Sequence, residues 1–103
     1  MNQTVARCQA KLEKYPNNEL ARFSLGKACF DLGHFLPAKE QFALALARKP
    51  DWMVAQILLG KCELALGNRP AAKAAFERAR QLAIEQHHEG PRTEMEQALA
   101  EME

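Results

Sequence analysis

The side chains best suited to chemistry in this 103-residue chain are its three cysteines and three histidines. Cys8, Cys29 and Cys62 are odd in number, and no two of them are spaced as Cys-x-x-Cys. Such a set supports neither a disulfide framework nor a zinc site. Cys29 and Cys62 fall on inward-facing positions of expected helices, which favours small buried hydrophobic groups over reactive thiols. Free cysteines favour a reducing compartment.

The histidines do not form a recognisable metal or acid–base site. His87 and His88 are adjacent, and adjacent residues on a helix point about 100° apart. We expect them to be solvated near the end of a helix, with metal binding or pH sensing as the alternative. His34 is expected at a turn, as a cap or an exposed side chain. The sequence has no serine elbow, no glycine-rich loop before a helix and no motif that pairs carboxylates. It therefore predicts no enzyme activity, no metal and no cofactor.

Composition limits the class of partner and the fold. The chain has 14 basic and 13 acidic residues, for a formal net charge of +1. This balance predicts no binding to nucleic acid and no binding to an anionic membrane. No apolar run reaches the ~20 residues of a membrane span, and residues 1–10 lack a signal-peptide core, so a cytoplasmic protein is expected. Strong helix formers dominate and β-branched residues are few, which predicts an all-α fold.

The chain contains an internal repeat, in which the pattern of residues 19–50 recurs over residues 53–84. When the two segments are aligned, ten positions are identical. Ordinary residue frequencies would give about two. The identical positions are mostly small or apolar and lie at helical spacing. They are Ala21/Ala55, Leu25/Leu59, Gly26/Gly60, Lys27/Lys61, Leu32/Leu66, Gly33/Gly67, Ala38/Ala72, Lys39/Lys73, Phe42/Phe76 and Ala45/Ala79.

The repeated residue types have physical reasons to recur. Gly26 and Gly60 fall inside expected helices, where glycine costs about 1 kcal/mol relative to alanine. A second helix that crosses too closely for a Cβ would explain them. Gly33 falls where the first helix must stop, and glycine adopts the left-handed C-cap conformation without steric cost. Each repeat is therefore predicted to be a pair of closely packed helices.

These residues resemble the tetratricopeptide repeat, whose period of about 34 residues equals the offset between the two copies. Leu25-Gly26 carries the resemblance in the first copy, together with Ala38, Phe42, Ala45 and Pro50; the second copy repeats it with Leu59-Gly60, Ala72, Phe76 and Ala79. The resemblance covers about two thirds of the chain. It implies a right-handed superhelix of antiparallel helical hairpins, with one hairpin over residues 19–52 and another over residues 53–86.

Helix boundaries follow from the turn and cap signals. The expected helices are Gln3–Lys14, Glu19–Leu32, Leu36–Arg48, Trp52–Leu66 and Pro70–Gln86, with Asn18 and Asp51 as caps. Pro16 lies one repeat before Pro50, so the N-terminal helix of residues 1–15 takes the place of the second helix of a preceding repeat. It is either a degenerate cap or part of a longer array.

A terminal helix is expected at the other end. The helix after Pro70 is expected to stop by Gly90-Pro91, and Thr93 to Glu96 has the form of a capping box. Met95, Leu99 and Met102 follow at helical spacing. This segment, residues 91–103, should cover the apolar flank of the last repeat, because an end repeat otherwise exposes half a core.

The resemblance implies a binding surface, because the first helices of such hairpins line a concave face. Its expected residues are Leu20, Phe23, Lys27, Phe30 and Asp31 from the first copy, and Val54, Ile57, Lys61, Leu64 and Ala65 from the second. Family members that clamp a C-terminal carboxylate have lysine at the position of Phe23 and asparagine at those of Lys27 and Lys61, so that ligand is not carried over. The alternative is that the lysines are ordinary solvated side chains and that the apolar residues serve packing. Trp52, in the turn between the repeats, is expected to be partly buried, with an exposed contact residue as the alternative.

Three functions remain open from the sequence. The first is a protein-interaction module that binds a peptide segment or a partner helix in the concave groove. The second is a structural subunit or array fragment that self-associates through its terminal helices, so the chain is expected to be a monomer or a weak homo-oligomer. The third is single-stranded RNA binding, which the near-neutral charge and the few exposed aromatic residues disfavour.

Overall fold

The protein is built from six α-helices, as seen in a computed structural model that describes residues 3–103. The first two residues of the expected N-terminal helical segment, 1–15, lie outside this range. The described residues form no strand. The helices are α1 (Gln3–Lys14), α2 (Glu19–Asp31), α3 (Phe35–Arg48), α4 (Met53–Ala65), α5 (Arg69–Glu85) and α6 (Glu89–Glu101). None of them is long and apolar enough to cross a membrane.

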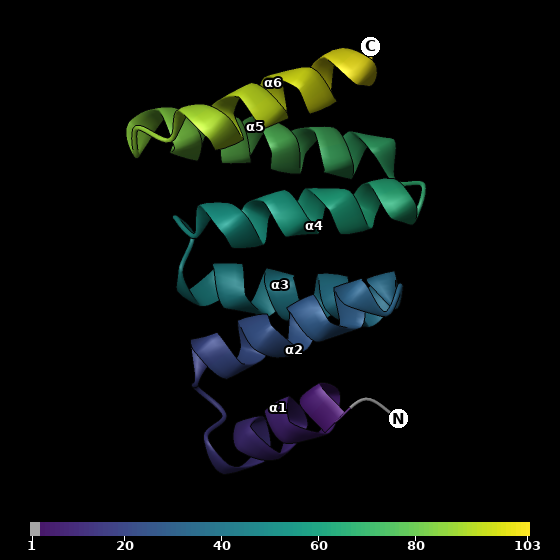
Figure 1. Cartoon of the computed structure of the whole chain (residues 1–103), viewed down its shortest axis with the longest axis vertical. Helices are drawn as coiled ribbons and strands as arrows, with labels where there is room; N and C mark the ends of the chain where they lie inside the picture. Colours follow the sequence, from purple (N-terminus) through teal and green to yellow (C-terminus); the bar gives the residue numbers. More distant parts are fainter. Residues whose placement is uncertain (1–2) are drawn as a thin grey trace.

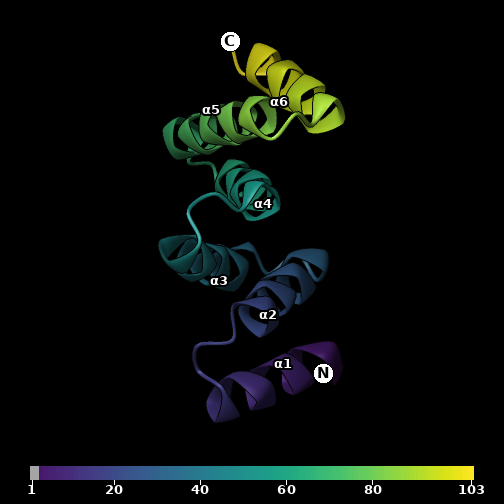
Figure 2. The ribbon, with the colours of Figure 1, turned by 90° about the vertical axis from the view of Figure 1, so that its left-hand side faces the viewer.

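The helices follow one another along the longest axis of the molecule, with the two chain ends at opposite ends of the stack (Figure 1). Turns of three or four residues reverse the chain after each helix. Consecutive helices therefore pack as antiparallel hairpins. Viewed from the side, α3 and α5 lie toward the left of the stack and α2 and α6 toward the right (Figure 2). The all-helical repeat architecture predicted from the sequence is confirmed.

The period of the repeat is visible in the helices themselves. α2 and α4 have the same length, and each bound of α4 lies one repeat after the corresponding bound of α2. The glycines inside these helices mark the crossings. A Cβ on Gly26 would lie 2.8 Å from Cε1 of Phe42, and one on Gly60 would lie 2.5 Å from Cε1 of Phe76. The packing reason inferred for both glycines is thus present in the structure.

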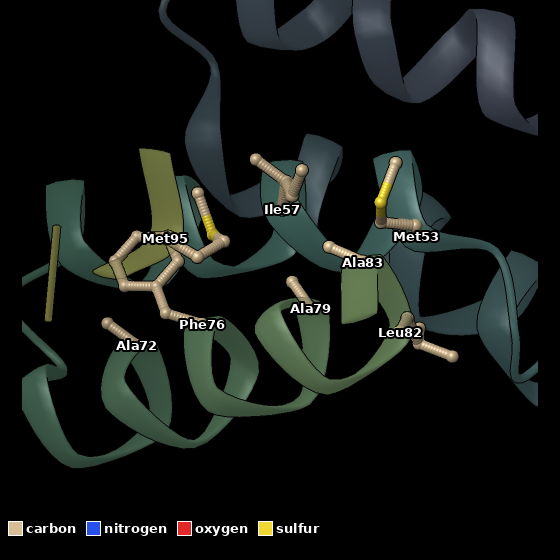
Figure 3. Close-up of a cluster of buried hydrophobic side chains, with 8 residues drawn as sticks. All are labelled: Met53, Ile57, Ala72, Phe76, Ala79, Leu82, Ala83 and Met95. Carbon is tan, nitrogen blue, oxygen red and sulfur yellow. The ribbon is translucent and has the colours of Figure 1, made fainter. Parts of the chain in front are cut away.

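Two hydrophobic clusters lie between the helices. The first cluster has residues from α1, α2, α3 and α4. It contains Cys8, Leu25, Cys29, Ala38, Phe42, Leu58 and Cys62. The second joins α4, α5 and α6 and is shown in Figure 3; it contains Met53, Ile57, Ala72, Phe76, Ala79, Leu82, Ala83 and Met95. All three cysteines are free and buried. Burial raises the pKa of Cys62 to about 11, with a smaller contribution from the neighbouring Glu63, so its reactive thiolate form is scarce at neutral pH.

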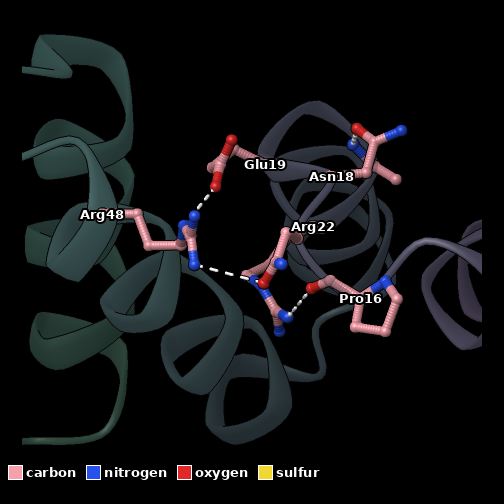
Figure 4. A network of polar contacts seen from close by, with 7 residues as sticks. Pro16, Asn18, Glu19, Arg22 and Arg48 are labelled. Atoms are coloured by element: carbon pink, nitrogen blue, oxygen red, sulfur yellow. Dashed lines mark hydrogen bonds and ion pairs between the residues drawn. The ribbon is translucent and has the colours of Figure 1, made fainter.

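Polar contacts join the turn after α1 and the two helices of the first hairpin (Figure 4). The side-chain oxygen of Asn18 accepts a hydrogen bond of 3.0 Å from the Ala21 amide, so the predicted N-cap of α2 is confirmed. Arg22 donates to the backbone oxygen of Pro16 at 3.0 Å. Arg48 of α3 forms an ion pair with Glu19 at the start of α2. These contacts tie the turn that follows α1 to α2, and the start of α2 to the end of α3.

Two cap predictions are wrong. The N-cap of α4 is Trp52 and not Asp51, and its side chain makes no capping hydrogen bond. At the far end, α5 stops at Glu85 and α6 already begins at Glu89, so Thr93 lies inside a helix and forms no capping box. Gly90-Pro91 lies in the first turn of α6, where a helix does not need the amide N–H that proline lacks.

The turn between α5 and α6 repeats the geometry of the turns inside the hairpins. In all three, the first residue after the C-cap has a positive φ: 78° at Gly33, 81° at Gly67 and 59° at His87. The next amide bonds back to the helix in each case, as His88 does to the Ala83 oxygen at 2.8 Å. This is the Schellman arrangement. The sequence did not reveal the third turn because a histidine stands where the other two have glycine.

Replacing His87 with glycine should raise the free energy of unfolding by about 0.5–1 kcal/mol. A non-glycine residue in the left-handed region costs about 1–2 kcal/mol, and the greater freedom of glycine in the unfolded chain offsets part of that gain. Urea denaturation monitored by circular dichroism measures the change. His88→Gly is the control, because His88 has a φ of −105° and gains nothing from glycine. Equal stability of the two variants would contradict the account of this turn.

Candidate partner-binding face

The expected site divides into exposed and packed residues. On α2, Leu20 is 68% exposed, the highest value among the large hydrophobic residues of the described chain. Lys27 and Asp31 are also exposed, and their side chains form an ion pair of 2.8 Å one helical turn apart. An exposed pair of this kind contributes about 0.3–0.5 kcal/mol. The ammonium group therefore faces solvent with a carboxylate already beside it.

The two phenylalanines of α2 serve mainly to pack the hairpin. The ring of Phe23 stacks on Trp52 with centroids 4.6 Å apart and lies 5.6 Å from Phe42. Phe30 meets the edge of Phe35 at 5.6 Å. Both rings are half-buried and join the first hydrophobic cluster. Phe23 and Phe30 are thus only partly open to solvent, and they pack against aromatic residues at the starts of α4 and α3. The expected partial burial of Trp52 is confirmed.

On α4 the expectation for Ile57 is wrong. Ile57 is 7% exposed and lies in the second cluster with Met95 of α6 (Figure 3). Its side chain therefore has almost no surface to offer a partner. Val54 and Leu64 are 45% and 39% exposed, so they belong to the open surface, as does Ala65.

The two repeated lysines have different partners. Lys61 lies 3.1 Å from a carboxylate oxygen of Glu94 on α6, whereas Lys27 pairs within its own helix. The repeat predicts equivalent positions on two helices but not these contacts. α6 falls outside the repeat, so its carboxylate could not be placed beside Lys61 from the sequence.

One buried polar contact was not anticipated. Glu63 of α4 is 8% exposed, and its Oε1 lies 3.0 Å from the ammonium nitrogen of Lys39 on α3. The pair lacks hydrogen-bond alignment, and this oxygen has no hydrogen-bond partner among the described residues. Glu63 stands where the first copy has Cys29. The contact joins the two hairpins, since α3 belongs to one and α4 to the other.

No group of three histidine, cysteine, aspartate or glutamate side chains within residues 3–103 is arranged to hold a metal ion. His34, His87 and His88 are all exposed and lie in turns. The exposed side chains of α2 and α4 described above are apolar residues and ion-paired lysines. Such a surface can bind another chain by contact and charge.

Comparison with known proteins finds the same fold in another solved structure. No family model and no curated protein matches the chain. The chain is similar to a protein from Bordetella parapertussis whose solution structure was determined as a structural-genomics target, with 28% identity and a TM-score of 0.85. The match covers 99% of this chain and 89% of the other. Both proteins therefore share one all-helical arrangement over nearly their full lengths.

Proposed function

We propose that the chain is a protein-interaction module of the tetratricopeptide type, which binds a peptide segment or a partner helix along the exposed stripe of α2 and α4. One observation carries the proposal. Leu20 and Val54 occupy equivalent positions one repeat apart, and both expose an apolar side chain. Lys27 and Lys61 repeat on the same two helices. The proposal includes no catalysis, no cofactor and no nucleic acid.

Apolar contact should supply most of the binding energy. A partner would place apolar side chains against Leu20, Val54 and Leu64. Its carboxylates would compete with Asp31 and Glu94 for the lysines, and exposed ion pairs of this kind contribute only about 0–1 kcal/mol. The lysines would thus orient the partner. A short surface on two hairpins fits a dissociation constant in the micromolar range, roughly −8 kcal/mol.

Self-association is the second candidate, and the charges of the terminal helices favour it. α1 carries Arg7, Lys11 and Lys14 against Glu13, whereas α6 carries four glutamates against one arginine. Two of those glutamates already form ion pairs, Glu94 with Lys61 and Glu96 with Arg80. The remaining attraction is small, which is why the partner-binding function ranks first. Sedimentation equilibrium separates the two, because only self-association gives a mass that rises with concentration.

The test of the proposed function is selection of peptides from a random display library on the immobilised protein, followed by mapping of the best binder by amide chemical shifts. Shifts should concentrate on α2 and α4. The double variant L20A/V54A should weaken binding about tenfold or more. The control L36A/L44A removes two exposed leucines of α3 and should bind as the parent does. Shifts confined to α3 and α5 would contradict the proposed face.

A further inference from the structure

The groove between α1 and α2 corresponds to a place that a helix fills in each complete hairpin. α1 ends at Lys14 and α3 at Arg48, so residues one repeat apart occupy equivalent places on the two helices. The positions of α3 that α2 covers therefore have counterparts on α1. Ala38, Gln41, Phe42 and Ala45 correspond to Thr4, Arg7, Cys8 and Lys11.

These equivalent positions differ in burial. Ala38, Phe42 and Ala45 are completely buried, and Phe42 lies against Gly26 of α2. Their counterparts Thr4 and Lys11 are exposed, and they line a groove of about 320 Å³ whose other wall is α2. Cys8, Leu20 and Ala21 are the apolar residues that line it. No helix within residues 3–103 lies over it.

The groove leaves more room for a side chain than the two helix crossings at Gly26 and Gly60 do. In the first hairpin the crossing residue must be Gly26, because a Cβ there would lie 2.8 Å from Phe42 and 3.2 Å from the Cβ of Gln41. On α1 the phenylalanine is replaced by Cys8, whose side chain is much smaller. A helix lying across α1 can therefore carry a large apolar side chain at the crossing. In a well-packed interface it must do so, because a glycine would leave a void.

The groove also has a defined charge. Arg7 and Lys11 are exposed on its rim and make no ion pair or hydrogen bond with the other described residues. Lys27 and Lys61 already have carboxylate partners. The first hairpin shows which residue of a crossing helix would face Arg7, since Arg22 of α2 bonds at 3.1 Å to Gln41, the counterpart of Arg7. A carboxylate at that position would meet the guanidinium group.

We propose that the α1–α2 groove binds an acidic amphipathic helix of a partner protein, in the place that α2 and α4 take in their own hairpins. The bound helix sets a large apolar side chain over Cys8 and a carboxylate against Arg7 and Lys11. This surface is separate from the stripe of α2 and α4 except at Leu20. The two proposals can therefore fail independently.

The probe is a pair of synthetic peptides that copy residues 17–32 of this chain, both with Arg22→Glu. One keeps the glycine of position 26 and the other carries Gly26→Leu. The leucine peptide should bind the parent protein about tenfold more tightly than the glycine peptide, with amide shifts on α1 and the start of α2. In the Cys8→Phe variant, which restores the side chain found in both hairpins, the order of the two peptides should reverse.

The double variant R7E/K11E should lose most of its affinity for the leucine peptide. Both changes lie at exposed positions, where substitutions have little effect on stability. Val54→Ala should leave that affinity unchanged, since Val54 lies outside the groove. The proposal would be overturned if millimolar peptide caused no shifts, or if the two peptides bound equally well to both the parent and the Cys8→Phe variant. Neither result would bear on the proposed binding along the stripe of α2 and α4. A mass that rises with protein concentration and falls back in R7E/K11E would show that a second copy fills the groove instead.

Discussion

Replacing Gly60 with leucine should lower the free energy of unfolding by about 3 kcal/mol, the upper end of the range for an overpacked core. A Cβ at this position would lie 2.5 and 2.6 Å from two carbons of the Phe76 ring. The ring cannot move aside, because Phe76 is only 2% exposed and lies within the second cluster. Leucine is a better helix former than glycine by about 1 kcal/mol, and the steric cost outweighs that gain. Urea denaturation measures the difference.

Gly90→Leu is the matched control. Gly90 also lies in a helix, and nothing stands within 4 Å of the Cβ that it would gain. This variant should be as stable as the parent or more stable. A second check is the double variant G60L/F76L, which removes ring carbons that the leucine would meet. It should be no less stable than F76L alone, since the two changes share one space. If Gly60→Leu unfolds like the parent, the helices do not cross at this glycine.

The repeat made much of the fold predictable, because the residues that form one helix crossing occur at equivalent positions in both copies. Gly26 and Gly60 are costly inside a helix, and their recurrence with Phe42 and Phe76 pointed to one close crossing in each hairpin. The structure contains both crossings. The presence of the helices followed from the strong helix formers. Their approximate bounds followed from prolines, which lie between helices or in the first turn of a helix. This information is local or repeated, so the sequence of a single chain carries it.

The last turn was not predictable in the same way. Gly90-Pro91 looks like the end of a helix, yet both residues are tolerated in the first turn of α6. The chain turns away after α5 at His87, whose positive φ is imposed by the surrounding structure and not by its own preference. A histidine gives no sequence signal for the left-handed conformation.

The candidate site was only partly predictable because α6 lies outside the repeat. Equivalent positions gave Leu20 and Val54 as exposed side chains, and the structure exposes both. Ile57 is buried in the cluster that includes Met95 of α6, and Lys61 is paired with Glu94 of the same helix. Such contacts depend on where the terminal helix packs. Periodicity of the two hairpins contains no information on that placement.

Replacing Met95 with alanine should lower the free energy of unfolding by about 2–5 kcal/mol, the range for truncating a buried methionine. Met95 is completely buried and is the only side chain of α6 within the second cluster's buried set (Figure 3). Truncation leaves a cavity beside Phe76 and Ile57, and the partly buried Leu99 and Met102 remain to hold the helix. A domain of this size is stable by only about 5–15 kcal/mol, so the loss is a large fraction of the total.

The control is Gln97→Ala on the same helix, where the side chain is exposed and the change should stay within about 0.5 kcal/mol. The readout that distinguishes a covering helix from a loosely attached one is hydrogen exchange. In Met95→Ala, faster exchange should appear in α6 and spread to α4, because Ile57 shares the second cluster with Met95 and Lys61 loses a fixed partner in Glu94. Exchange that quickens in α6 alone, with parental stability, would show that α6 contributes nothing to the core of the second hairpin.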